Sequence, residues 1–285
     1  MCANRTRIRA SGFGGWTTQK SSSGFSGYKY DSQGIAIGVD RMLAESLSIG
    51  FAAGFSKGDL KIRDLDYRNK PDILNLALTA AYAHASGFYA SAILGYGHAW
   101  NKYTVDIDPL FGGGTKTGKH GSDIWSANVE LGYVRELPND FFLAPSLGLE
   151  YSHLRNNGWT ESVSDPAVLA PNRFDRSREN NLGIPVGLRA NKRFALVNSG
   201  VIVPELRASW TGYPKRAIPS INAGFEGMPG AATMRGVDPG RSHWRLGAGL
   251  SGRANGMVDF GVNYGFDVRR GFRAHSVMAG VGLSF

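Results

Sequence analysis

The last ten residues of the chain constrain its fold more than any other segment. Residues 276–285 read SVMAGVGLSF, and their apolar members alternate with small or polar ones; these apolar members are Val277, Ala279, Val281, Leu283 and Phe285. Successive side chains of a β-strand point to opposite faces, so this strand has one apolar face and one small, polar face. Such a pattern, ending on an aromatic residue, is typical of the wall of a transmembrane β-barrel.

Composition agrees with a barrel. Glycine makes up 39 of the 285 residues and proline only 12, and that glycine share is about twice the usual one. The sequence has no run of 18 or more consecutive apolar residues, which excludes a transmembrane helix. A membrane-spanning chain of this kind has to form a closed barrel, because only closure pairs every backbone group within the lipid.

Two further features limit the class of protein. The net charge is +9, but the sequence has no basic helix, zinc-finger spacing or RNA-binding signature, so we expect no nucleic-acid partner. Positive loops instead suit an outer leaflet rich in lipid phosphates. The single cysteine, Cys2, excludes a disulfide framework. Residues 1–10 lack the apolar stretch of a secretory signal, so we expect an exported form to be a mature piece or a fragment.

Alternation of period two predicts twelve strands. They cover about residues 7–17, 25–39, 47–56, 73–85, 88–105, 124–135, 141–153, 181–192, 201–212, 242–252, 257–269 and 273–285. The long connections, residues 57–72, 106–123, 154–180 and 213–241, all fall at one end, and short turns join the strands at the other. Short periplasmic turns and long extracellular loops are typical of bacterial outer-membrane barrels. We therefore predict an all-β fold, a 12-stranded antiparallel transmembrane β-barrel that occupies residues 1–285 as one domain.

Aromatic residues gather near the predicted strand ends, where amphipathic rings sit at headgroup level. The set is Trp16, Tyr28, Tyr30, Trp100, Tyr103, Tyr133, Tyr151, Trp210, Trp244, Tyr264 and Phe266. Filling of a soluble core is the alternative interpretation of these aromatics, since alternation alone fits both.

Strand parity predicts a charged interior. The residues expected to line the lumen are Glu130, Glu150, Arg189, Glu205, Arg207, Arg245 and Asp259. Because both signs of charge are present, this interior is expected to be hydrated and able to hold or pass a polar chain. Twelve strands lie between the filled eight-stranded barrel and the open sixteen-stranded channel, so one helix, about 10–12 Å across, or one extended hairpin is a plausible occupant.

Two short motifs resemble nucleotide-binding sequences, but the residues around them do not fit such sites. Residues 113–119, GGTKTGK, resemble a phosphate-binding loop, but His120 stands where Ser or Thr is required, and we expect a flexible external loop. Residues 247–252, GAGLSG, match GxGxxG, but a helix is not expected to follow, so Gly247 and Gly249 are expected at inward strand positions. The six histidines are dispersed and GxSxG is absent. We expect no catalytic residue, no metal site and no cofactor.

Several segments carry a family resemblance. GYKYDSQGIAIGVDR at 27–41, PELRASW at 204–210, MRGVDPGRSHWRLGAGLSG at 234–252 and the terminal VGLSF, together with Trp16, resemble the translocator β-domain of bacterial autotransporters (type V secretion). The resemblance extends over nearly the whole chain. It implies an integral barrel of the bacterial outer membrane that anchors an N-terminal passenger and carries it to the cell surface.

The resemblance also implies partners and site residues. The partners are outer-membrane lipid, the barrel-assembly machinery, for which Phe285 is the C-terminal assembly signal, and the protein's own passenger where upstream sequence exists. In that family a helix and a passenger precede the first strand, and neither is expected in residues 1–285. Some members cut their own linker with acidic lumen residues; we interpret Glu130 and Glu150 instead as pore-lining groups or structural ion pairs.

Two other functions are open at this point. A stand-alone outer-membrane porin or adhesin would use the long loops and would need no passenger. A barrel hydrolase would assemble Ser, His and Asp side chains from distant strands. Ion conductance without a passenger would indicate the first alternative, and labelling by a serine reagent would indicate the second.

Overall fold

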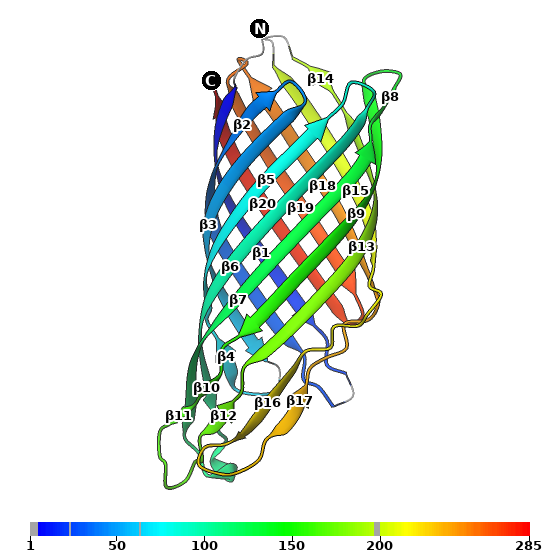
Figure 1. Ribbon diagram of the computed structural model, residues 1–285. Coiled ribbons are helices and arrows are strands. Elements are labelled where there is room, and N and C mark those ends of the chain that lie inside the picture. Colours follow the sequence, from blue (N-terminus) through cyan, green and yellow to red (C-terminus); the bar gives the residue numbers. More distant parts are fainter. Residues whose placement is uncertain (1–4, 23, 63, 197–199) are drawn as a thin grey trace.

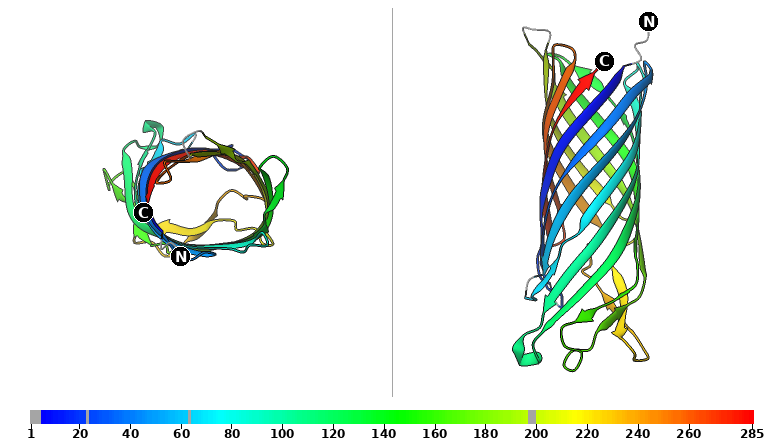
Figure 2. Two further views of the ribbon diagram at one scale, coloured as in Figure 1. Left: turned by 90° about the horizontal axis from the view of Figure 1, so that it is seen from above. Right: turned by 90° about the vertical axis from the view of Figure 1, so that its left-hand side faces the viewer.

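Twelve long antiparallel strands form a closed barrel in the computed structural model, which describes residues 5–22, 24–62, 64–196 and 200–285. The twelve are β1 (Thr6–Gln19), β2 (Tyr28–Ala44), β3 (Leu47–Ile62), β5 (Asp72–Ala83), β6 (Phe88–Asp106), β7 (Thr115–Tyr133), β9 (Phe141–Asn156), β13 (Ser177–Lys192), β15 (Val201–Gly212), β18 (Ser242–Ala254), β19 (Val258–Arg269) and β20 (Phe272–Ser284). Closure comes from pairing of β1 with β20, from Arg7 opposite Ser284 to Gln19 opposite Phe272. The predicted 12-stranded antiparallel barrel is confirmed (Figures 1 and 2).

The alternation read in the sequence becomes the two faces of the wall. On β20, Val281 and Leu283 are 61% and 58% exposed on the outer face, whereas Ser284 is 6% exposed. On β2, Ile35 and Ile37 are equally open. Apolar side chains on the outside of a closed barrel face lipid. A soluble protein of this size would bury these side chains, so the distribution excludes the soluble-core interpretation.

The two ends of the barrel differ. The end at which Thr6 and Phe285 exchange backbone hydrogen bonds is called the terminal rim; it holds both termini and short turns (Figure 1). Two short strands, β8 (Arg135–Leu137) and β14 (Phe194–Ala195), extend this rim. The opposite end, the loop rim, holds the long connections. No helix among the described residues is long and apolar enough to cross a membrane.

The prediction of long loops is wrong in part, because several strands continue beyond their lipid-facing apolar residues into the segments that were expected to be loops. β7 starts at Thr115, so most of the predicted loop 106–123 is strand, and residues 115–119 of the GGTKTGK motif belong to it. β3 runs on to Ile62, and β4 (Tyr67–Asn69) pairs with β3 and β6. Backbone pairing does not require lipid, so a strand continues wherever a neighbouring strand supplies hydrogen bonds.

The remaining loop residues form a small sheet, called the loop lobe. Its strands are β10 (Trp159–Thr160), β12 (Asn172–Phe174), β16 (Ser220–Phe225) and β17 (Ala232–Arg235). Beside it, β11 (Ser162–Val163) pairs with β7, and a 3-10 helix, η1 (Pro109–Phe111), precedes β7. The Trp159 ring stacks between His120 and Phe174, with centroid distances of 4.0 and 4.6 Å. These three rings anchor the lobe to the end of β7.

The prediction of an aromatic girdle needs a correction at three residues. Trp16, Trp100 and Trp244 are more than half exposed on the outer face, as a girdle requires. Tyr28 and Tyr30, in contrast, share the inward face of β2, opposite to Ile35 and Ile37. Tyr103, on β6, is 3% exposed and contacts Trp159 of the loop lobe, and its hydroxyl donates to Glu161. Proximity to a strand end had not distinguished the two faces.

Met1 and Cys2 lie outside the described residues.

Candidate functional site

The barrel interior holds the predicted lumen residues, and four of them form one chain of ion pairs. Arg189 on β13 lies between two carboxylates, 3.3 Å from Glu130 on β7 and 3.8 Å from Glu205 on β15. Glu205 in turn accepts a close contact from Arg207, at 2.7 Å. Tyr89 on β6 donates to Glu130 at 2.8 Å. Because the charges alternate in sign, this middle belt is close to neutral while remaining polar.

Small residues allow the belt to cross strands that contribute no charge. β9 lies between β7 and β13, and where Glu130 passes over β9 its cross-strand neighbour is Gly148. β18 lies between β15 and β19, and Arg207 reaches over it to the Asn263 Oδ1 atom at 2.8 Å. A side chain added at Gly249 of β18 would meet that oxygen at 2.6 Å. Gly247 and Gly249 thus lie at inward strand positions, as predicted.

Glu150 is the centre of a second cluster nearer the loop rim. Arg245 on β18 donates to its carboxylate at 2.9 Å, and the Tyr213 hydroxyl donates to it at 2.9 Å. Arg245 also lies 3.3 Å from Asp267, which pairs with His243 at 2.9 Å. Glu150 therefore connects β9 to β18 across two intervening strands.

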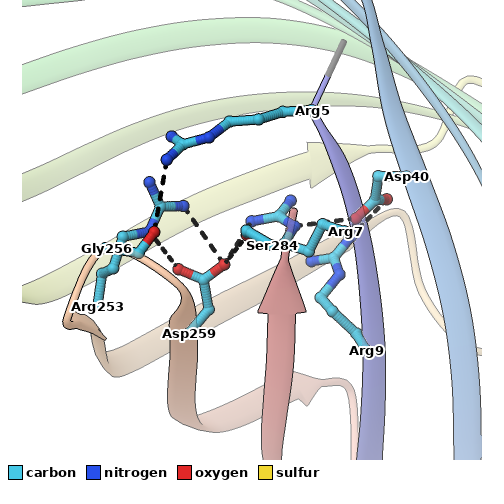
Figure 3. A network of polar contacts seen from close by, with 8 residues as sticks. All are labelled: Arg5, Arg7, Arg9, Asp40, Arg253, Gly256, Asp259 and Ser284. Atoms are coloured by element: carbon cyan, nitrogen blue, oxygen red, sulfur yellow. Dashed lines mark hydrogen bonds and ion pairs between the residues drawn. The ribbon is translucent and has the colours of Figure 1, made fainter. Parts of the chain in front are cut away.

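Asp259 is the centre of a third network, at the terminal rim (Figure 3). Its carboxylate accepts from Arg253 at 2.7 Å and from the Ser284 hydroxyl at 2.9 Å, and Arg7 lies 3.8 Å away. Arg7 also donates to Asp40 at 3.1 Å. The network connects β18, β19, β20, β1 and β2 in order, so it crosses the seam where the first and last strands meet.

Two hollows occupy the interior. One, of about 690 Å³, lies at the terminal rim and is lined by Arg7, Arg9, Asp40, Arg253 and Asp259, among others. The other, of about 710 Å³, lies toward the loop rim and is lined by Tyr28, Glu179, Tyr213, Met234 and Arg269, among others. Mixed charges and small residues around such hollows suit water and extended polar chain rather than one tightly held small ligand.

Phe285 lies apart from the lumen residues. It is 68% exposed, and its backbone N–H donates to the Thr6 carbonyl at 3.0 Å. The aromatic ring therefore ends the wall at the terminal rim, beside the seam.

Sequence reasoning missed members of all three networks. Tyr89, Arg7, Asp40, Asn263 and Asp267 supply partners that the parity argument had not included. Parity could have found Asn263 and Asp267, which share the inward face of β19 with Asp259. It could not have found the contact of Asn263 with Arg207, because β19 and β15 are not neighbouring strands.

The described residues contain no cluster of three His, Cys, Asp or Glu side chains suited to a metal ion. Within the same residues, a serine hydroxyl contacts a histidine ring only at Ser86 and His84, which are two positions apart in an exposed turn with no carboxylate bonded to the ring. His243 has its carboxylate partner, but the hydroxyl nearest to its Nδ1 atom is that of Tyr213, at 3.4 Å. These geometries give no support to a serine-hydrolase site.

Comparison with known proteins gives a family match. The autotransporter beta-domain family matches residues 8–265. Among curated proteins, outer membrane protein B of Rickettsia typhi is 22% identical over 94% of this chain, which covers 16% of that relative. Outer membrane protein A of Rickettsia rickettsii is 25% identical over 96% of this chain, which covers 13% of that relative. The chain thus spans about a sixth or less of the length of these relatives.

Solved structures agree on the fold. The translocator domain of the autotransporter NalP from Neisseria meningitidis superposes with a TM-score of 0.74 at 15% identity, covering 98% of this chain and 88% of that one. The beta domain of the Bordetella autotransporter BrkA gives a TM-score of 0.70 at 22% identity, covering 98% and 99%. Both are similar to this chain in fold.

Proposed function

The chain belongs to the autotransporter β-domain family, and on that premise we propose that this outer-membrane barrel anchors a passenger joined to its N-terminal end and carries it to the cell surface. The terminal rim then faces the periplasm and the loop rim faces outward, as in bacterial barrels with short periplasmic turns. The observation that carries the proposal is the family match together with a closed barrel that has a polar, charge-balanced interior.

The position of the first strand supports this role. Thr6 pairs with Phe285 at the terminal rim, so a polypeptide joined ahead of β1 starts at the periplasmic mouth of the lumen. From there the chain would pass the hollow at the terminal rim and then the middle belt. The paired charges of the belt keep the passage hydrated without a strong field of one sign. Passenger folding outside the cell would supply the directional force, and the barrel would need no bond-breaking chemistry.

Two partners follow from the surface. Outer-membrane lipid would cover the exposed apolar band that includes Ile35, Ile37 and Val281. The barrel-assembly machinery would engage the exposed Phe285 at the end of β20, where the last strand is accessible before it pairs with β1. The seven lumen residues are proposed to line this passage rather than to cut a linker, since Glu130 and Glu150 already accept hydrogen bonds from Arg189 and Arg245.

The test is the intact mass of the native species that ends at Phe285, taken from a fractionated outer membrane before and after protease treatment of whole cells. We expect a species heavier than the 30.7 kDa of this chain, trimmed by protease to a barrel-sized core. A 30.7 kDa outer-membrane species that conducts ions and loses no mass would overturn the proposal in favour of a porin. Folding itself is read separately, from β-type circular dichroism and shifted mobility of unboiled protein.

A further inference from the structure

Four consecutive strands, β6, β7, β9 and β13, carry outward basic residues near the loop rim. They are Lys102 on β6, Lys119 on β7, Arg155 on β9 and Arg178 on β13; we call them the basic rim patch. Each shares strand parity with exposed lipid-facing residues of its own strand, as Lys102 does with Leu94 and Trp100, which are 57% and 51% exposed. The patch therefore lies on the membrane side of the wall and outside the lumen.

The strand register opposes these charges in like pairs. Lys102 is directly opposite Lys119 across β6 and β7, and Arg155 is directly opposite Arg178 across β9 and β13. Directly opposed side chains on one face have Cβ atoms about 4.5–5.5 Å apart, and like charges in that position are destabilising. An anion bound over either pair would relieve this repulsion.

The described part of the chain supplies one carboxylate to these four cations, Asp123, which lies opposite Arg155. None of the four patch residues has a side-chain ion pair within 4.0 Å among the described residues. Asp123 also accepts hydrogen bonds from Tyr96 and His98 at 2.8 and 2.7 Å, and its single charge leaves the four cations with an excess of positive charge.

A third like pair shows the contrast. Lys61 is opposite Arg68 across β3 and β4, and there Asp59 pairs with both, at 3.8 and 2.6 Å. Here the carboxylate pairs with both cations, whereas among the described residues neither like pair of the basic rim patch has a carboxylate within 4.0 Å of both cations.

The depth of the patch matches lipid headgroups. Phe88 and Trp100 are exposed rings toward the two ends of the outward face of β6, which is apolar as far as Leu94 and carries Tyr96 and His98 before Trp100. Twelve residues at about 3.3 Å each, tilted by about 40°, span roughly 30 Å, close to the hydrocarbon thickness. Lys102 and its opposite Lys119 lie one outward position beyond Trp100, which is the level of phosphate groups.

We propose that the basic rim patch binds the headgroup of an outer-leaflet lipid that carries at least two phosphates, one over each like pair. The acyl chains of that lipid would lie on the exposed apolar face below, which includes Trp125 and Leu149, 55% and 48% exposed. This inference goes beyond passenger translocation and rests on the proposed outward orientation of the loop rim.

The experiment measures the melting temperature of the purified barrel in zwitterionic detergent micelles with increasing amounts of a bisphosphorylated glycolipid. The variants are K102Q/K119Q, R155Q/R178Q and all four together. The matched control is K29Q/R273Q, which removes two outward, exposed cations at the same rim that are separated by Thr18 and do not oppose each other directly. A dephosphorylated lipid and inorganic phosphate are the comparison ligands.

We expect the bisphosphorylated lipid alone to raise the melting temperature of the wild type. Each cation should contribute about fivefold to the lipid affinity, so each double patch variant should need about 25-fold more lipid for the same rise in melting temperature. The quadruple variant should show no rise. In lipid-free micelles the patch variants should melt no lower than the wild type, because the repulsion is removed.

The proposal is overturned if the quadruple variant responds like the wild type, if K29Q/R273Q loses as much of the response as a patch variant, or if inorganic phosphate reproduces the rise. A lower melting temperature of the lipid-free patch variants would also count against it, since it would make the four cations part of the fold. None of these results bears on passenger export, which is tested by mass and protease on cells.

Discussion

Glu150 and Arg245 pair at 2.9 Å across the barrel interior although 95 residues separate them in the chain. The two intervening strands, β13 and β15, lie beneath the pair, and Gly183 of β13 leaves room for the Glu150 side chain, whose atoms lie within 2.8 Å of where a Cβ would be. Long charged side chains over small residues thus brace the wall from within, on the face opposite to the apolar band.

The change Glu150→Gln should lower the free energy of unfolding by about 1–2 kcal/mol. This is less than the cost of breaking a fully buried ion pair, because the Arg245 side chain is 42% exposed. The physical reason is that Arg245 loses its charged partner while the glutamine still accepts from Tyr213. Urea unfolding in detergent measures the effect. Glu136→Gln, an exposed carboxylate in a terminal-rim strand, is the control and should change little. Equal losses in both variants would contradict a bracing role for the pair.

Removal of the Asp259 charge should weaken the seam. In Asp259→Asn, Arg253 and Arg7 lose their shared carboxylate while Ser284 retains an acceptor. We expect a loss of about 1–2 kcal/mol, seen as conversion of the fast-migrating unboiled form at a lower temperature on gel electrophoresis. Asp31→Asn, an exposed outward carboxylate on β2, serves as control. An unchanged conversion temperature for Asp259→Asn would show that backbone pairing of β1 and β20 suffices.

Truncation of Trp159 should release the loop lobe without opening the barrel. The ring stacks on His120 and Phe174 and donates to the Tyr103 hydroxyl at 2.8 Å. Each of the two aromatic contacts contributes about 1 kcal/mol. We therefore expect protease to cleave Trp159→Ala within residues 157–176 at least roughly tenfold faster than it cleaves the wild type. Leu110→Ala, at a side chain 88% exposed, should leave proteolysis unchanged. If the barrel of Trp159→Ala also lost its heat-resistant mobility, the lobe would be part of the barrel's stability.

Acid should loosen the loop between β17 and β18 at Asp238. The Gly240 backbone N–H, followed by Arg216, lowers the pKa of this carboxyl from 3.8. A group whose folded pKa is depressed contributes stability above its unfolded pKa and loses that contribution as pH falls through the folded value. Hydrogen exchange in residues 213–241 should therefore be slow at pH 7 and rise below about pH 4, after correction for intrinsic rates. In Asp238→Asn, hydrogen exchange in the same residues should be fast at both pH values. If this variant were as protected as the wild type at pH 7, the Asp238 carboxylate would not be what holds the loop in place.

Much of the fold follows from local chemistry. The alternation in residues 257–269 and 273–285 predicts β19 and β20 to within a residue or two at each end, because lipid and lumen select opposite residue types at every second position. The same parity puts Glu130, Arg189 and Asp259 on one face of their strands. Where that selection stops, as beyond Ile124, the prediction ends too early and misses the first nine residues of β7.

The sequence by itself determined the strand count, the faces of the strands and the resemblance to autotransporter translocators, since each depends on residue types within a few positions. Only the tertiary structure decided which charges meet. The Glu130–Arg189, Glu150–Arg245 and Arg7–Asp259 contacts skip one or two strands, and the opposition of Lys102 to Lys119 and of Arg155 to Arg178 depends on the ladder register. Closure of the barrel sets the inward contacts, because pairing β1 with β20 brings the inward faces of strands distant in the chain toward one common interior. The outward oppositions come from the hydrogen-bond register between neighbouring strands.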